Sequence, residues 1–147
     1  MKFVIAQPSL VKLICAVVLA VTVCSCSAEN GTHAEKAATS AARTWLAAID
    51  EGDYGQTWTN AAAGFKSAVT SEKWTDSMQR YRKPLGSLIS RTVKSAKEMF
   101  SLPGAPDGDY VVMQFESSFA EKKSAIETVT FLLEKDGQWR AAGYYIK

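Results

Sequence analysis

Residues 125–146, AIETVTFLLEKDGQWRAAGYYI, predict two antiparallel strands joined by a hairpin. Apolar residues alternate with threonines over residues 125–135, and a second extended run covers residues 139–146. Asp136-Gly137 lies between the two runs and is the strongest short hairpin signal, because Asp-Gly readily adopts the positive φ angles of a two-residue loop. The end of the chain therefore indicates an antiparallel sheet.

The length of the hairpin loop also predicts the register of the two strands. A two-residue loop places Glu134 opposite Trp139 and Val129 opposite Tyr144. Since side chains alternate between the two faces of a strand, this register determines which residues meet on the same face.

Two further runs with a period of two precede the hairpin, at residues 87–97 and 110–119. The connection between them contains the sequence SLPGAPDGD. Ala105–Gly108 fits a type I turn, with proline second and glycine fourth, and a positive φ is expected for the glycine. A phosphate-binding loop would need GxxxxGK[ST] before a helix. We interpret the stretch as a plain hairpin connection.

A helical period of three to four residues runs from Ala34 to Leu85. The first predicted helix ends at Gly52. The second is capped by Asp53 and runs past Gly64, and the third begins near Thr70 and ends at Pro84. Helices followed by a four-strand meander predict an α+β domain, with the N-terminal helices packed on a curved antiparallel sheet.

The first 26 residues have the order of a secretory signal: lysines, an apolar run over residues 13–23, then small residues. VCSC at residues 23–26 resembles a bacterial lipobox, in which Cys26 becomes the lipidated first residue. An ordinary signal cut after Ala28 and an uncleaved signal anchor remain alternatives. Ser27 after the cysteine favours, by resemblance, an outer-membrane lipoprotein facing the periplasm; otherwise the protein is periplasmic or secreted.

Residues 27–36 are interpreted as a tether and residues 37–147 as a single domain. The three cysteines all lie at or before Cys26, so the domain is expected to depend on packing rather than on disulfides. Lys2 and Lys12 account for two of the 17 basic residues, which leaves 15 against 15 acids beyond the signal. A neutral domain argues against nucleic acid as a partner.

Several blocks resemble the bacterial domain-of-unknown-function 4019 family (DUF4019): AARTWLAAIDEGDYGQTWTNAAAGFKSAVTSEKW, RKPLGSLISR, LPGAPDGDYVVMQF, ETVT and DGQWRAAGYYI. The resemblance runs from Ala37 to Ile146 and departs at Ala141-Ala142, where larger residues are common. It implies membership of the nuclear-transport-factor-2-like or cystatin-like α+β group, in which a curved sheet wraps helices and often leaves a cone-shaped pocket. It implies no established activity and no catalytic residues.

The available side chains limit the chemistry of the domain. The only histidine is His33 in the predicted tether, so a Ser-His-Asp arrangement cannot be built. No cofactor and no metal site are expected, because there is no His/Cys cluster. Arg80, Arg82 and Lys83 are interpreted as a solvated helix end. The candidate ligand-binding residues are Arg91, Glu116, Glu127, Arg140 and Tyr144.

Two functional hypotheses follow from these residues. The first is a non-enzymatic module that binds an envelope protein or a small apolar ligand and is held at the membrane by its lipid anchor. The alternative is a small-molecule enzyme, of isomerase, cyclase or hydrolase type, that uses carboxylates and tyrosines in a cone-shaped pocket. A carboxylate buried in a pocket against a tyrosine or arginine would favour the enzyme. A filled apolar core with an exposed patch would favour the module.

Overall fold

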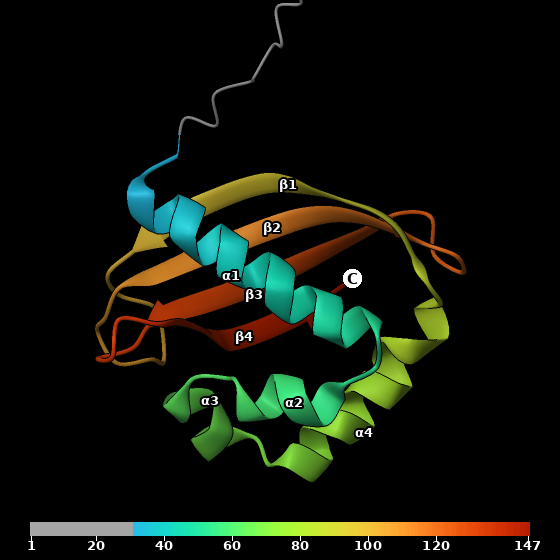
Figure 1. Ribbon diagram of the computed structural model, residues 1–147, viewed down its shortest axis with the longest axis horizontal. Coiled ribbons are helices and arrows are strands. Elements are labelled where there is room, and N and C mark those ends of the chain that lie inside the picture. The colour runs from blue at the N-terminus through green and yellow to red at the C-terminus, as the bar shows by residue number, and fades with distance from the viewer. Residues whose placement is uncertain (1–30) are drawn as a thin grey trace, which may run out of the picture.

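The computed structural model describes residues 31–147, which form the expected α+β fold of N-terminal helices on a four-stranded antiparallel meander (Figure 1). The strands lie in the order β1-β2-β3-β4. The helices are α1 (His33–Asp50), α2 (Tyr54–Thr59), α3 (Ala63–Ala68), α4 (Ser71–Tyr81) and the 3₁₀ turn η1 (Lys83–Leu85). The strands are β1 (Leu88–Met99), β2 (Tyr110–Phe119), β3 (Ala125–Leu133) and β4 (Trp139–Ile146).

The first helix begins at His33, one residue before the helical period predicted from Ala34. The Thr32 side chain accepts a hydrogen bond from the Glu35 N–H at 3.1 Å, and the Glu35 carboxylate accepts one from the Thr32 N–H at 2.9 Å. This reciprocal capping box satisfies two donors that the helix leaves free. His33 to Lys36, assigned to the tether from sequence, therefore form the first turn of α1. The predicted signal peptide, its cleavage site and the start of the tether lie outside the described residues.

The single helix predicted from Asp53 past Gly64 is wrong, because the chain forms two short helices there. Asp53 caps α2 as expected, accepting from the Gln56 N–H at 3.2 Å. The helix then breaks where the Ala62 N–H donates to the Ala141 carbonyl of β4 at 2.9 Å. A continuous helix would direct that N–H to the carbonyl four residues earlier. The bond to β4 therefore separates α2 from α3.

The predicted two-residue hairpin loop is also wrong. Trp139 lies opposite Leu133 and not opposite Glu134. The Glu134 N–H donates to the Gln138 carbonyl at 2.9 Å, and Gly137 follows the turn with a φ of 76°. The loop therefore has three residues, 135–137. A loop of this length needs a positive φ at its last residue, which Gly137 supplies.

The other predicted pair, Val129 with Tyr144, is confirmed. The register of β3 and β4 shifts by one residue because Ala142 has no partner on β3. Such a bulge re-aims the residues that follow it. Here it turns Tyr144 toward the same face of the sheet as buried Val129, which places the tyrosine against the helices.

The connection between β1 and β2 is a turn, but not at the residues predicted. A hydrogen bond of 3.1 Å closes Leu102–Ala105 rather than Ala105–Gly108. Pro103 followed by Gly104, whose φ is 79°, is the arrangement of a type II turn. Gly108 does not have the positive φ that was expected.

Gly104→Ala is therefore expected to lower the free energy of unfolding by about 1 kcal/mol or more, because alanine is strained at positive φ. Asp107→Ala should leave the melting temperature unchanged, since its side chain is exposed. Thermal unfolding of the two variants measures the difference. Equal melting temperatures for both variants and the unchanged protein would contradict the assignment of the turn.

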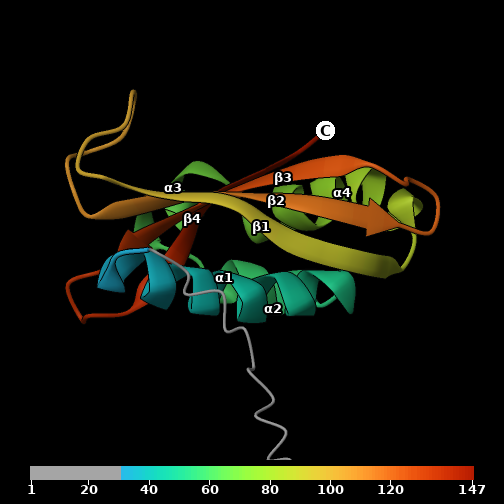
Figure 2. The ribbon, with the colours of Figure 1, turned by 90° about the horizontal axis from the view of Figure 1, so that it is seen from above.

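The hydrophobic core lies between α1 and the sheet. α1 crosses one face of the sheet, and α2, α3 and α4 lie beyond β4 (Figures 1 and 2). Side chains from α1 and from the inner faces of β2 and β3 are fully buried there: Ala38, Ala42, Leu46, Val111, Met113, Phe115 and Val129. The helices and the sheet therefore bury one common hydrophobic core. Within residues 31–147, no helix is both long and apolar enough to cross a bilayer.

Candidate functional site

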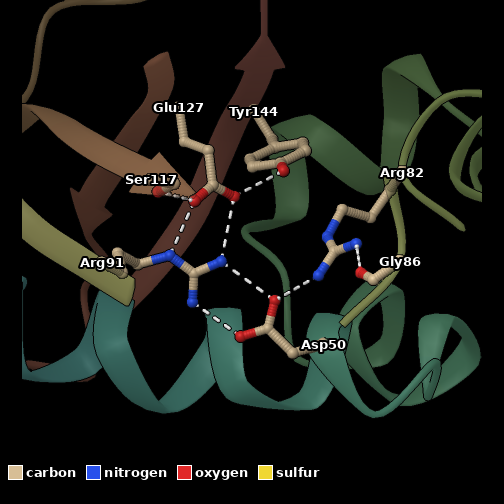
Figure 3. Close-up of polar contacts among 7 residues, drawn as sticks. All are labelled: Asp50, Arg82, Gly86, Arg91, Ser117, Glu127 and Tyr144. Atoms are coloured by element: carbon tan, nitrogen blue, oxygen red, sulfur yellow. Dashed lines mark hydrogen bonds and ion pairs between the residues drawn. The ribbon is translucent and has the colours of Figure 1, made fainter. Parts of the chain in front are cut away.

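Six charged and polar side chains meet where the end of α1 approaches the inner face of the sheet (Figure 3). They form what we call the buried polar cluster: Asp50, Arg82, Arg91, Ser117, Glu127 and Tyr144. Each comes from a different part of the fold: the end of α1, the residue after α4, and the four strands in order. The cluster therefore joins the helices to every strand of the sheet.

Glu127 lies at the centre of the cluster and is fully buried. Its Oε2 accepts from Arg91 Nε at 2.6 Å and from the Ser117 hydroxyl. Its Oε1 accepts from the Tyr144 hydroxyl at 2.7 Å and from Arg91 Nη2 at 3.1 Å. A carboxylate offers about four acceptor positions, and four donors occupy them here.

Arg91 bridges the two acidic groups of the cluster. Besides Glu127, its guanidinium contacts the Asp50 carboxylate through Nη1 at 2.6 Å and through Nη2 at 2.9 Å. Burial by itself would lower the pKa of Arg91, but its hydrogen bonds to Asp50 and Glu127 and their negative charges outweigh that effect and raise the pKa. Arg91 therefore remains a cation held on both sides by carboxylates.

Arg82 closes the other side of Asp50. Its Nη2 donates to Asp50 Oδ1 at 2.8 Å and its Nη1 to the Gly86 carbonyl at 2.9 Å. The guanidinium carbon lies 4.2 Å from the centre of the Phe119 ring, which is within the range of a cation–π contact. Its Nε is buried without a hydrogen-bond partner among residues 31–147. Two arginines and two carboxylates thus balance in charge.

Tyr144 belongs both to the buried polar cluster and to an aromatic stack. Its ring centre lies 5.8 Å from that of Trp45 and 6.1 Å from that of Trp74. Burial raises the pKa of the Tyr144 hydroxyl, and the negative charge of Glu127 and the hydrogen bond to it raise the pKa further. The hydroxyl therefore remains protonated and continues to donate to Glu127.

The chemistry open to the cluster is limited by these bonds. A general base needs a free acceptor position within reach of the proton it removes. Glu127 has its acceptor positions filled, and the Tyr144 hydroxyl already directs its proton at the carboxylate. The arrangement is suited to holding α1, α4 and the sheet together.

The ring of Tyr144 also forms part of the wall of an apolar groove of about 590 Å³ between α3, α4 and β4. We call this the apolar groove. Its apolar and aromatic lining consists of Phe65, Val69, Trp74, Met78, Tyr81, Leu85, Tyr144, Tyr145 and Ile146. Ser77, Lys122 and Lys147 complete it. Its volume falls within the range of small-molecule sites, about 300–1,000 Å³.

Two other hollows differ from the groove in chemistry or in size. A polar hollow of about 550 Å³ beside Asp50 and Arg82 also contains Glu51, Asp53 and Lys83, so its charges are of mixed sign. A smaller hollow of about 310 Å³ lies under Trp45, Phe131 and Trp139. Of the two hollows with a mainly apolar lining, the apolar groove is the larger.

The family described as "Protein of unknown function (DUF4019)" matches residues 41–144. The chain belongs to the DUF4019 family. No curated protein matches it. Because the family's description specifies no activity, the function of this DUF4019 chain has to be inferred from its own geometry. The matched region includes every member of the buried polar cluster and most of the apolar groove.

Of the five residues predicted from sequence, the structure brings three together: Arg91, Glu127 and Tyr144. It separates the other two from the cluster. Glu116 is exposed and pairs with Lys94 at 3.1 Å, and Arg140 pairs with Asp136 at 2.7 Å beside the last hairpin.

Sequence reasoning missed three members of the cluster. Asp50 and Ser117 are not among the candidate residues named from sequence. Arg82 was assigned to a solvated helix end, but only 3 % of it is exposed. A signal for Ser117 was present, since it lies two residues from Phe115 and from Phe119 and so shares their inward face. Arg82 carried no comparable signal, because it follows the last regular turn of α4.

Proposed function

We propose that this DUF4019 protein is an exported, lipid-anchored envelope protein that binds an apolar ligand or a segment of a partner protein in the apolar groove, without catalysing a reaction. The observation that carries the proposal is the contrast between the two features that meet at Tyr144. The groove is open and mainly apolar, whereas the carboxylate behind it has its acceptor positions filled. Apolar surface that remains open on a folded domain is commonly a binding site.

One observation favours the alternative, a small-molecule enzyme. Glu127 touches both a tyrosine and an arginine, and that tyrosine lines the groove. For catalysis, a substrate would have to displace one of the four donors on Glu127, at the full cost of leaving a buried polar group unpaired. Because the described groove lining does not include Glu127, we favour binding.

Filling the groove tests the proposal. Ser77 lies on α4 in the groove lining, so Ser77→Trp places an indole in the open space without removing a core contact. We expect Ser77→Trp to weaken the binding of the uncharged dye Nile red by about ten-fold or more. Ser67→Trp makes the same substitution on the exposed surface of α3 and should leave dye binding unchanged. Fluorescence titration measures both affinities.

Thermal unfolding of the two tryptophan variants serves as the folding control, and both are expected to melt close to the unchanged protein. Equal dye affinity in Ser77→Trp and in the unchanged protein would mean that apolar compounds bind elsewhere, and the groove would lose its proposed role.

The lipid anchor is a separate prediction. The lipobox-like VCSC motif predicts that the mature protein begins at Cys26 with a diacyl or triacyl modification. Mass spectrometry of the mature amino terminus should detect this mass, and Cys26→Ser should abolish it. An unmodified amino terminus at Glu29 would instead support ordinary signal cleavage.

A further inference from the structure

The charged side chains of the apolar groove are of one sign. Lys122 and Lys147 are the charged side chains of its lining, and no acidic side chain of residues 31–147 belongs to that lining. Neither ammonium group forms an ion pair within the described part of the chain. The polar hollow beside Asp50, by comparison, mixes acids with cations. An anion is therefore the natural complement of the apolar groove.

The backbone places both lysines near the start of β3. Lys122 lies in the connection between β2 and β3, where its carbonyl accepts from the Phe119 N–H at 2.8 Å. Lys147 follows β4 and exchanges two backbone hydrogen bonds with Ile126, at 3.0 and 3.1 Å, at the start of β3. Both lysines are therefore attached to backbone that is fixed by hydrogen bonds close to one end of β3.

Apart from Ser77 and the two lysines, the groove lining is apolar and aromatic. Ile146, Met78 and Val69 supply aliphatic contacts from β4, α4 and the residue after α3. The exposed rings of Tyr81 and Tyr145, 61 % and 62 % accessible, flank the opening. A site with two cationic side chains and an otherwise mainly apolar lining matches a molecule with an anionic head and an apolar tail.

We propose that the apolar groove binds a long-chain monoacyl carboxylate, a free fatty acid, with its carboxylate at Lys122 and Lys147 and its chain along the aliphatic and aromatic lining. This inference rests on the proposed function, because it specifies the ligand of the same groove. The groove volume is that of a site for one small ligand, which favours a single acyl chain over a bilayer surface. Lys122 is half-buried and Lys147 is exposed. Each lysine contributes modestly, and the apolar contacts supply most of the affinity.

The test uses the exported chain from Ser27 to Lys147, whose helices and sheet share their own core. Nile red is displaced by three probes with the same twelve-carbon chain, each below its micelle concentration: laurate, dodecanol and dodecyltrimethylammonium. Lys122→Met/Lys147→Met removes the two charges but keeps the apolar stems. Lys36→Met/Lys97→Met removes two exposed charges outside the groove and is the matched control.

We expect laurate to bind the unchanged chain more tightly than dodecanol does, and dodecyltrimethylammonium to bind most weakly. Lys122→Met/Lys147→Met should weaken laurate binding by about three- to ten-fold and leave dodecanol unaffected, and the control pair should change neither. Raising the salt concentration should reduce the preference for laurate, because exposed charges are screened.

Three results would overturn the inference. Equal affinity for laurate and dodecanol would show that the groove does not recognise an anionic head group. Displacement of Nile red by dodecanol alone would overturn the inference but leave the proposed function standing. Binding to vesicles of anionic phospholipid that depends on the two lysines, without laurate binding, would assign the groove to a membrane surface. If none of the probes displaces a dye whose binding is sensitive to Ser77→Trp, the groove binds another class of ligand.

Discussion

Arg91→Met is expected to lower the free energy of unfolding by about 3–5 kcal/mol, the usual cost of leaving a buried charge without its partner. Glu127 is fully buried and would keep only the hydroxyls of Ser117 and Tyr144. Asp50 would keep Arg82. The substitution preserves most of the apolar volume of the side chain, so the loss reports on the charge rather than on a cavity.

Urea unfolding of three further variants, Glu127→Met, Arg91→Met/Glu127→Met and Arg140→Met, sharpens this result. The double variant Arg91→Met/Glu127→Met should be more stable than the sum of the two single losses, because it removes the uncompensated charge together with its partner. Arg140→Met removes an arginine whose ion pair with Asp136 is exposed, and should change stability little. If Arg91→Met and Arg140→Met proved equally harmless, the buried polar cluster would not be a structural junction.

Trp74→Ala is the second large effect, with an expected loss of about 3–5 kcal/mol. Trp74 is 5 % exposed, and its ring packs against three others: Trp45, Phe65 and Tyr144. Its indole N–H also donates to the Thr57 hydroxyl at 3.0 Å. Truncation leaves a cavity where α4 meets α1 and β4, and it removes that hydrogen bond.

Trp74→Phe separates the two contributions. Phenylalanine retains an aromatic ring but loses the N–H, so this variant should lose only about 1–2 kcal/mol. Tyr145→Ala, on the exposed side of β4, is the control and should unfold at the same urea concentration as the unchanged protein. An alanine variant at Trp74 that is as stable as the Tyr145 control would show that the aromatic stack does not hold α4 in place.

The period-two pattern of the strands predicts most of the fold from sequence. The runs at 110–119 and 139–146 coincide with β2 and β4, and the alternation within β2 correctly separates buried Phe115 from exposed Glu116. The same alternation contained information about the site, because Glu127 shares its face with Val129 and Phe131. Glu127 could therefore have been placed in the core and Glu116 outside it from sequence alone.

Other features depend on contacts that a local pattern does not contain. The break between α2 and α3 arises from the bond between Ala62 and Ala141, which lie far apart in the sequence. The predicted pair of Val129 with Tyr144 holds only because the bulge at Ala142 offsets the error in the predicted loop length, and the weak alternation from 139 to 146 does not indicate that bulge. Arg82 is buried because Asp50, at the end of another helix, offers it a partner.

Tyr144 connects the structural and the proposed functional parts of the molecule. Its hydroxyl is fixed by Glu127, and its ring forms both the aromatic stack and the wall of the apolar groove. A side chain held at both ends by packing and hydrogen bonding gives a binding surface a fixed shape. The buried polar cluster thus fixes part of the groove wall, which would favour the binding that we propose for the groove.

Intermolecular nuclear Overhauser effects between bound Nile red and the methyl groups of the chain test this account most directly. We predict contacts from the dye to Val69, Met78 and Ile146, which line the apolar groove. Contacts confined to Ala41 and Ala48, in the smaller hollow under Trp45, would contradict the assignment of the groove as the binding surface.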